Sequence, residues 1–454
     1  MKRWILGLLA LGVAASTAWA TPHREAITEP LADGRAATRE CLKCHEDAAE
    51  SIMRTNHWTL AKVQTLADGR QVELGKKNVL NNYCGSIKSN WARCTSCHIG
   101  YGWVGEDFAL DKPENVDCLV CHDTTGTYRK DTNSGGEVFQ TVNILRVAQN
   151  VGAPTRDTCG ACHFAGGGGD GVKHGDMDSS LAYPERQLDV HMATDGLDFT
   201  CQQCHVEGGH KFSGRSLTIS PAATDHFGCE KCHEGALHSD PTLDRHAARV
   251  ACQTCHIPAF AREVPTKMAW DWMTGGRDDL AEKHSGETQH GRAVYTKGKG
   301  HAEWGLKVVP AYAWYNGRAD AYLVGDKIDP ATTTVLNAPH GSRTDPAAKI
   351  FPFKVHKGRQ PYDLEHRYLL PMHTTGAEGF WTSFDWEKTL RIGAEAFGLT
   401  YSGKFGAADT ESWWKVNHMV APKEKALKCL DCHGETGRLD WQRLGYEKDP
   451  MNKI

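Results

Sequence analysis

The sequence predicts a mainly α-helical fold with long irregular loops and little β structure. Apolar residues come in short runs that 46 glycines and many polar residues separate, which indicates short elements and long connections. Stretches of strand length that alternate between apolar and polar residues are scarce. The chain also carries one five-residue motif, Cys-x-x-Cys-His, eight times between Cys41 and His433.

The first 20 residues have the features of an export signal. Lys2 and Arg3 precede an apolar run, and the segment ends in Ala18 and Ala20, two small residues at a cleavage position. Such leaders are removed on export, so we expect a signal peptide over residues 1–20 and a periplasmic mature chain. No later stretch reaches the roughly twenty apolar residues of a membrane helix, so we expect no membrane-embedded part.

The repeated motif accounts for 16 of the 17 cysteines. It is typical of c-type haem attachment, in which both thiols are bonded to the porphyrin and the histidine lies beside the iron. Zinc sites also use Cys-x-x-Cys pairs, but zinc does not require a histidine after every pair. We therefore expect eight covalently bound haem c groups, attached through Cys41, Cys44, Cys94, Cys97, Cys118, Cys121, Cys159, Cys162, Cys201, Cys204, Cys229, Cys232, Cys252, Cys255, Cys429 and Cys432, with the motif histidines His45, His98, His122, His163, His205, His233, His256 and His433 beside the irons.

The motifs divide the chain unevenly. Residues 21–256 form a haem-rich region with seven motifs, and residues 257–454 form a wrapping region with the eighth. The wrapping region holds eight of the 14 tryptophans between residues 257 and 428, and such large side chains must be buried against apolar surface. We expect the two regions to form one compact unit whose core is packed with haem.

Periodicity predicts a few elements outside the motifs. Helical spacing occurs over residues 45–58, 384–398 and 411–420. Residues 307–324 have β character that Pro310 and Gly317 interrupt, which predicts at most a hairpin or two.

A low-spin haem needs a second axial ligand, and 16 histidines lie outside the motifs. Closeness to a motif or to a short apolar segment favours nine of them as distal ligands: His57, His174, His191, His210, His226, His238, His246, His373 and His418. The other seven are expected to lie mostly at the surface: His23, His284, His290, His301, His340, His356 and His366. If every iron is closed by two histidines, the protein is an electron conduit or store. If one iron is open, that haem can reduce a substrate.

Several details together resemble the octahaem tetrathionate reductases, which are periplasmic respiratory c-type cytochromes. Besides the eight motifs, they are the lone Cys84 in "NNYCGS", the glycine run that leads to Lys173, and the ending "NHMVAPKEKALKCLDCHG". The resemblance covers the chain from the first motif to the last. Hydroxylamine oxidoreductases and octahaem nitrite reductases also carry eight haems, so reduction of nitrite or hydroxylamine stays an alternative, as does a non-catalytic electron carrier.

The resemblance implies that the amine of Lys173 binds the iron of the haem on Cys94 and Cys97. An open position then requires that Lys173 and His98 do not both hold the iron, and we expect His98 to be turned away. The glycines before Lys173 would let the backbone approach its surroundings closely.

Tetrathionate is a dianion, and two electrons cleave its central sulfur–sulfur bond to give two thiosulfates. A thiolate attacks such bonds, which makes Cys84 a candidate catalytic residue; the alternatives are an inert cysteine or an intermolecular disulfide. Asp170 could orient a ligand, or only shape a turn. We expect a small anionic substrate and, as electron donor, a redox partner protein or a membrane quinol oxidase. The net charge of −4, which omits the haem propionates, argues against a nucleic-acid partner.

Overall fold

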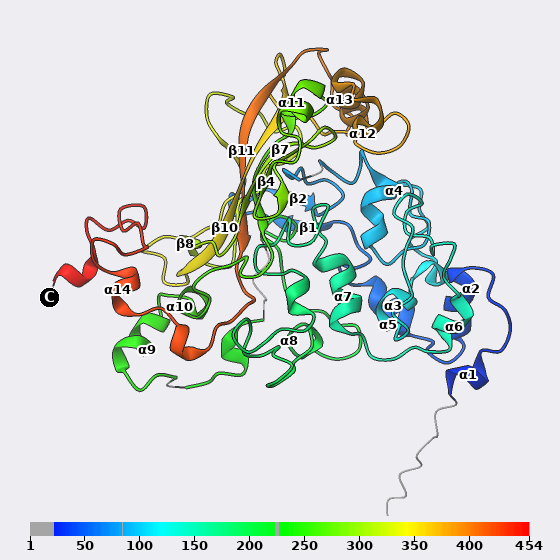
Figure 1. Cartoon of the computed structure of the whole chain (residues 1–454), viewed down its shortest axis with the longest axis horizontal. Helices are drawn as coiled ribbons and strands as arrows, with labels where there is room; N and C mark the ends of the chain where they lie inside the picture. Colours follow the sequence, from blue (N-terminus) through cyan, green and yellow to red (C-terminus); the bar gives the residue numbers. More distant parts are fainter. Residues whose placement is uncertain (1–21, 84, 223–226, 236, 454) are drawn as a thin grey trace, which may run out of the picture.

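The computed structural model describes residues 22–453 except residues 84, 223–226 and 236. A row of short helices and loops forms the base of the molecule, and a large sheet rises from it (Figure 1). The described chain begins at one end of the long axis and the C-terminus lies at the other. Within the described residues, no helix is both long and apolar enough to cross a membrane.

The α-helices are short, and most belong to the haem-rich region. They are α1 His23–Ala26, α2 Gly34–Leu42, α3 Ala48–Met53, α4 Trp91–Cys94, α5 Leu119–His122, α6 Ile144–Ala148, α7 Arg156–His163, α8 Gln202–His205, α9 Pro241–Ala247, α10 Cys252–His256, α11 Asp278–Lys283, α12 Phe380–Ser383, α13 Trp386–Glu395 and α14 Cys429–Cys432. The helices expected within residues 45–58 and 384–398 are confirmed as α3 and α13.

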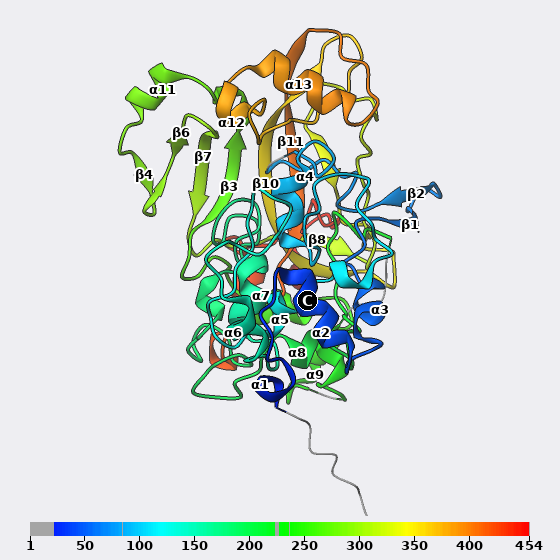
Figure 2. The ribbon, with the colours of Figure 1, turned by 90° about the vertical axis from the view of Figure 1, so that its right-hand side faces the viewer.

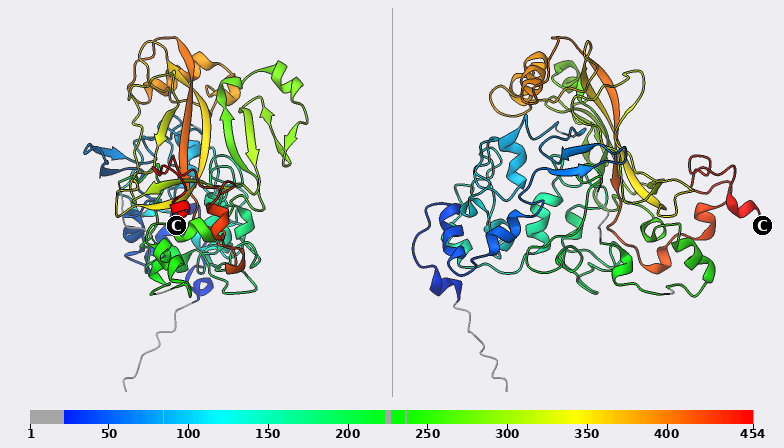
Figure 3. Two further views of the ribbon diagram at one scale, coloured as in Figure 1. Left: turned by 90° about the vertical axis from the view of Figure 1, so that its left-hand side faces the viewer. Right: turned by 180° about the vertical axis from the view of Figure 1, so that it is seen from behind.

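The strands form one large sheet and two hairpins. They are β1 Lys62–Thr65, β2 Gln71–Leu74, β3 Thr266–Asp271, β4 Thr288–Gln289, β5 Arg292–Ala293, β6 Tyr295–Thr296, β7 Gly300–Gly305, β8 Ala311–Tyr315, β9 Thr334–Asn337, β10 Lys349–Asp363 and β11 Phe405–Lys415. The seven-stranded sheet has the order β6-β7-β3-β10-β11-β9, and β8 pairs with β10 beside this path. Figure 2 shows these strands spread above the helical base, and Figure 3 shows them from the opposite side and from behind.

The prediction of a mainly α fold with little β structure is therefore wrong. The central strand, β10, contains Pro352 and Pro361, and proline ordinarily argues against a central strand because it cannot donate to the ladder. Pro352 nevertheless lies opposite Tyr312 of β8, and Pro361 lies opposite Ala407 of β11. Both prolines are buried, so the strand tolerates them where the sequence pattern suggests a break.

Two local predictions fail for a related reason. Residues 411–420 were expected to be helical, but β11 extends to Lys415. Trp413 packs with Phe353 and Trp414 packs with Tyr83, in two separate core clusters. A strand that is covered on both faces shows no alternation of apolar and polar residues. The apolar pattern of residues 411–420 therefore resembles that of a helix. Likewise, residues 307–324 hold β8, which belongs to the large sheet instead of an isolated hairpin.

The sheet and the haem-rich region meet in one apolar cluster. Tyr83, from the chain ahead of the second motif, packs with Trp270 of β3 and Trp414 of β11. Leu390 and Ala394 of α13 belong to the same cluster. Since Tyr83 precedes Cys84, this cluster fixes the position of the chain that leads to the second motif.

Candidate functional site

Each motif coils through about one helical turn. In α7, for example, Cys159, Cys162 and His163 stand at positions i, i+3 and i+4, which share one helix face. Thr155 caps this helix by accepting a hydrogen bond from the backbone N–H of Thr158, and the Thr158 hydroxyl lies 2.9 Å from the backbone N of Thr155. The two thiols and the imidazole thus lie on the same side of the helix, where one large group can contact all three.

Seven of the eight motif histidines face the ring of a second histidine. The ring centres of every such pair lie between 6.1 and 6.4 Å apart. The pairs are His45 with His23, His122 with His210, His163 with His57, His205 with His418, His233 with His191, His256 with His238, and His433 with His246.

This spacing fits a metal ion between the two rings. Metals hold imidazole nitrogens at about 2.0 Å, so two imidazoles on opposite sides of one metal have their centres about 6 Å apart. Each pair contains the histidine of a Cys-x-x-Cys-His motif, whose thiols would bond to the porphyrin. The residues present therefore fit haem c.

Many of these histidines are also oriented through Nδ1. The Nδ1 of His122 lies 2.8 Å from the carbonyl oxygen of Gly152, and that of His205 lies 3.0 Å from the carbonyl oxygen of Ser213. The Nδ1 of His433 lies 2.6 Å from Asp449 Oδ1. When Nδ1–H donates to such an oxygen, the lone pair on Nε2 is left for a metal.

Cysteines of different motifs lie close enough to influence each other's thiols electrostatically, and these pairs order the motifs along the base. The pairs are Cys41 and Cys118, Cys121 and Cys159, Cys159 and Cys201, Cys204 and Cys232, Cys229 and Cys252, and Cys255 and Cys432. In Figure 1 the same order runs from α2 through α5, α7, α8 and α10 to α14. The second motif joins this row from the side, because Cys97 interacts with Cys162 of the fourth motif.

His98 of that second motif differs from the other seven motif histidines. Its ring is 4% exposed, and no histidine ring of the described residues faces it as in the seven pairs. Its Nδ1 lies 3.2 Å from the carbonyl oxygen of His57, while its Nε2 is buried without a hydrogen-bond partner. The Nδ1 of His98 thus lies against a backbone carbonyl oxygen, as do the Nδ1 atoms of His122 and His205. This contact gives no support to the expectation that His98 is turned away from the iron.

Two lysines that the sequence reasoning missed lie close to His98. Lys130 Nζ contacts the carbonyl oxygens of His98 and Gly100, at 2.5 and 3.0 Å, and lies 3.4 Å from Asp117. Burial lowers the pKa of His98 well below its ordinary value, and the charge of Lys76 lowers it further. Asp117 balances the charge of Lys130, so the main positive charge that acts on His98 is that of Lys76.

The glycine run before Lys173 packs tightly against its neighbours. Gly167 has a φ of 80°, and a Cβ there would lie 3.1 Å from both the Lys173 Cβ and the Tyr83 ring. Only glycine combines this backbone with so close an approach. The run is therefore a tightly packed turn that sets where Lys173 begins.

The backbone of Lys173 is held by two buried side chains. Lys354 Nζ donates to the carbonyl oxygens of Val172 and Lys173, at 2.9 and 3.0 Å, and the Tyr83 hydroxyl donates to the Lys173 carbonyl at 3.2 Å. The Lys173 side chain extends over Trp414, with Nζ 4.9 Å from the ring centre. Desolvation by the surrounding protein lowers the pKa of His163 to about 3 and that of His174 well below its ordinary value, and the charge of the unbound Lys173 amine lowers both further.

Asp170 is engaged within its own loop. Both of its carboxylate oxygens accept hydrogen bonds from Ser179, from the backbone N–H at 2.8 Å and the hydroxyl at 2.6 Å. Its carbonyl oxygen accepts from Arg292 at 3.3 Å. This geometry favours the turn-shaping role over direct contact with a ligand.

The remaining expected ligands fall into three groups. Of the nine favoured distal histidines, His57, His191, His210, His238, His246 and His418 lie in pairs with motif histidines. His174 packs edge-on to Trp414 and His373 Nδ1 contacts the carbonyl oxygen of Ser89, so neither faces a motif histidine. Cys84 and His226 lie outside the described residues, as does the expected signal peptide.

His23, which was not favoured, faces His45 with the ring centres 6.2 Å apart. Its position shortly after the expected cleavage point gave no reason to expect this pairing.

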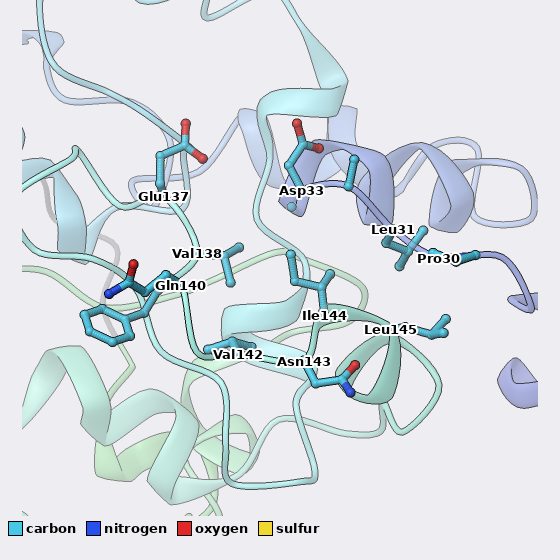
Figure 4. Close-up of a pocket in the computed structure, with 13 residues that line it drawn as sticks. Pro30, Leu31, Asp33, Glu137, Val138, Gln140, Val142, Asn143, Ile144 and Leu145 are labelled. Atoms are coloured by element: carbon cyan, nitrogen blue, oxygen red, sulfur yellow. The ribbon is translucent and has the colours of Figure 1, made fainter.

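A surface cleft of about 500 Å³ lies elsewhere, between the segment 30–34 and the segment 137–145. Figure 4 shows Asp33, Glu137 and Asn143 among the labelled residues that line it. None of the candidate site residues belongs to its lining. This cleft is thus distinct from the second motif.

Comparisons with known proteins agree with this geometry. A family model described as "Cytochrome c bacterial" matches residues 267–436, and one described as "Cytochrome c554 and c-prime" matches residues 40–123. An uncharacterized protein of Archaeoglobus fulgidus is 24% identical over 229 residues, which are 40% of this chain and 76% of that protein. The crystal structure of octaheme cytochrome c from Shewanella oneidensis superposes with a TM-score of 0.89 at 49% identity, covering 95% of this chain and 98% of that chain. Together with the motif and histidine geometry, this similarity shows that the chain belongs to the octahaem c-type cytochromes, which carry covalently bound haem c.

Proposed function

We propose that the protein is a periplasmic respiratory reductase with eight haem c groups, one of which is the reaction site. The observation that carries the proposal is the contrast between seven motif histidines that face a second histidine and His98, which faces none among the described residues. A haem with two histidine ligands exchanges electrons but has no position for a substrate. The haem on Cys94 and Cys97 would be the one with an open position.

Lys173 is our proposed protein ligand at that iron. Its support is the resemblance of the glycine run, the hydrogen bonds that hold its backbone, and its place against Trp414. An iron-bound lysine must be neutral, because the metal displaces its proton. His98 Nε2 is the competing ligand, since it is buried without a partner.

The proposed substrate is tetrathionate. Haem c supplies electrons one at a time, and two electrons convert one tetrathionate dianion into two thiosulfates. The Cys84 thiolate would attack a central sulfur and release the first thiosulfate. Two electrons would then cleave the resulting disulfide-like bond, which releases the second thiosulfate and restores the thiolate. The positive charge of Lys76, which acts on His98, supports an anionic substrate.

The row of motifs along the base supports electron delivery to this site. Electrons accepted from a redox partner protein or a membrane quinol oxidase would pass along the row and leave it at the fourth motif, where Cys162 interacts with Cys97 of the second. The second motif lies at the side of the row, so a substrate there would not block transfer between the other motifs.

The proposal is tested by the oxidation of a reduced viologen dye, measured in parallel with tetrathionate, nitrite and hydroxylamine. We expect the highest kcat/KM with tetrathionate. A higher value with nitrite or hydroxylamine would keep the open haem and reject the sulfur chemistry. No turnover with any of the three would favour the non-catalytic electron carrier.

A further inference from the structure

The central strand β10 carries a buried imidazole that hydrogen-bonds to nothing in the structure as described. His356 is 0% exposed, and both Nδ1 and Nε2 lack a hydrogen-bond partner. A neutral imidazole has one donor and one acceptor, and burying either unsatisfied costs free energy. Buried polar groups normally have a hydrogen-bond partner. The two imidazole nitrogens of His356 therefore indicate that a hydrogen-bonding group binds there.

The surroundings of His356 select a negatively charged partner. The groups whose charge acts on its ring are Lys354 and Lys267, both nearly fully buried. Burial and these charges keep the imidazole neutral, with one N–H to donate. An anion would accept that hydrogen bond beside the buried Lys354 ammonium, whose three printed contacts are all with uncharged oxygens.

The neighbouring side chains connect His356 to the Lys173 loop. The His356 ring stacks on Tyr83, with the ring centres 4.2 Å apart and the planes 30° apart. The Tyr83 hydroxyl donates to the Lys173 carbonyl. Lys354 does not hydrogen-bond to the His356 imidazole, because its Nζ already contacts the carbonyl oxygens of Val172 and Lys173 and the hydroxyl of Thr266.

We propose that His356 is an oxyanion-binding residue of the Lys173 site, with its imidazole N–H donating to a negatively charged oxygen. The inference rests on the proposed function for the location of the reaction site. Two groups supply the required chemistry, an oxygen of the bound anionic substrate and a carboxylate oxygen of a haem propionate. Either one satisfies the buried imidazole.

The test compares the variant His356→Phe with the wild-type holoprotein. Phenylalanine preserves the ring that stacks on Tyr83 and removes both nitrogens. The matched control is His366→Phe, since the His366 ring is only half-buried and also stacks on a tyrosine, Tyr368, with the ring centres 5.5 Å apart. Two quantities are measured: the affinity of the oxidised protein for nitrite and for tetrathionate, from spectral titrations, and the midpoint potentials of the haems, from redox titration.

If the substrate supplies the oxygen, His356→Phe weakens anion binding about tenfold or more and leaves the potentials unchanged. If a propionate supplies it, the affinity is retained and the potential of one haem falls, because the carboxylate loses a hydrogen bond. Unchanged affinity together with unchanged potentials would overturn the proposal. If His356→Phe does not fold, His356→Asn, which keeps an N–H donor, replaces it and is expected to show the same effects in weaker form.

The failure of the proposed function would look different. If neither nitrite nor tetrathionate binds to the wild-type protein, the reaction site is rejected. The potentials of His356→Phe then decide the role of His356 alone, with a lowered potential in support and unchanged potentials against it.

Discussion

Lys173 is the residue on which the proposed reaction site depends most. Replacing it with alanine removes the amine and leaves no side-chain group that can bind iron. We expect Lys173→Ala to lower turnover about 100-fold or more and to change the spin state of one haem, measured by viologen assay and electron paramagnetic resonance. The control is Lys211→Ala, whose side chain is 75% exposed and forms a surface ion pair with Glu207. An unchanged spectrum and rate would reject the ligand role of Lys173.

His23 tests the pairing of histidines at the position where the sequence pattern least favoured a ligand. It faces His45 at 6.2 Å, so His23→Ala should remove one ligand from the haem of the first motif. We expect one low-spin haem to become high-spin in the oxidised protein. His340→Ala is the control, because His340 contacts Asp320 at the surface and should leave every haem signal intact. If His23→Ala leaves all signals intact as well, His23 is not an axial ligand.

Asp178 gives a pH-dependent prediction. It is 0% exposed, and burial raises its pKa to about 6. Between about pH 4 and pH 6 the folded protein therefore binds more protons than the unfolded chain, so the buried carboxylate destabilises the fold above about pH 6 and does not below about pH 4. Asp178→Asn should raise the free energy of unfolding by about 1–3 kcal/mol at pH 7. Thermal unfolding across this pH range checks it, and a gain that persists at pH 4 would contradict the charge effect.

At the scale of elements, the glycine turn before Lys173 is tested by two alanine substitutions. Gly167→Ala meets the Lys173 Cβ and the Tyr83 ring at 3.1 Å and also strains a positive φ. Gly69→Ala, in the turn between β1 and β2, has a similar φ of 86° but open space around it. Backbone strain should lower the free energy of unfolding of both variants by about 1 kcal/mol. Gly167→Ala alone should lower it further, because of its close contacts, and should alter the spectrum of one haem. Equal effects would show that the tight packing around Gly167 does not position Lys173.

Element-level patterns explain what could and could not be predicted. α3 and α13 followed from local spacing, because the i, i+3 and i+4 positions of a helix are encoded within a few residues. β10 and β11 did not, since Pro352 and Pro361 are tolerated within β10 and Trp413 and Trp414 are buried in different clusters. Strand pairing depends on partners far away in the chain, and local patterns contain no information about them.

The histidine pairs have the same limitation at the scale of the whole molecule. Counting showed that ligands were plentiful, but closeness in sequence was a poor guide to pairing. His418 faces His205 and His210 faces His122, each across many residues, whereas His174 lies near a motif and faces none of the motif histidines. The pairing is a property of the complete fold.

The whole molecule should require haem to fold. Its apolar side chains are distributed over ten separate clusters in the described part of the chain, and the mean hydropathy is only −0.51. Haem would supply the apolar surface that joins them. A chain expressed without haem attachment should show no cooperative unfolding by circular dichroism and should be digested rapidly by protease. A cooperative transition in that chain would contradict a haem-packed core.

We propose that seven irons are closed by histidine pairs and that one is not. Low-temperature magnetic circular dichroism and electron paramagnetic resonance of the oxidised wild-type protein test this difference, because they distinguish haems with two histidine ligands from a haem with lysine or an open position. We predict signals from seven haems with two histidine ligands and from one haem of a different kind, which alone responds to added anion. Eight signals of the two-histidine kind, unchanged by nitrite or tetrathionate, would contradict the account and leave an electron carrier.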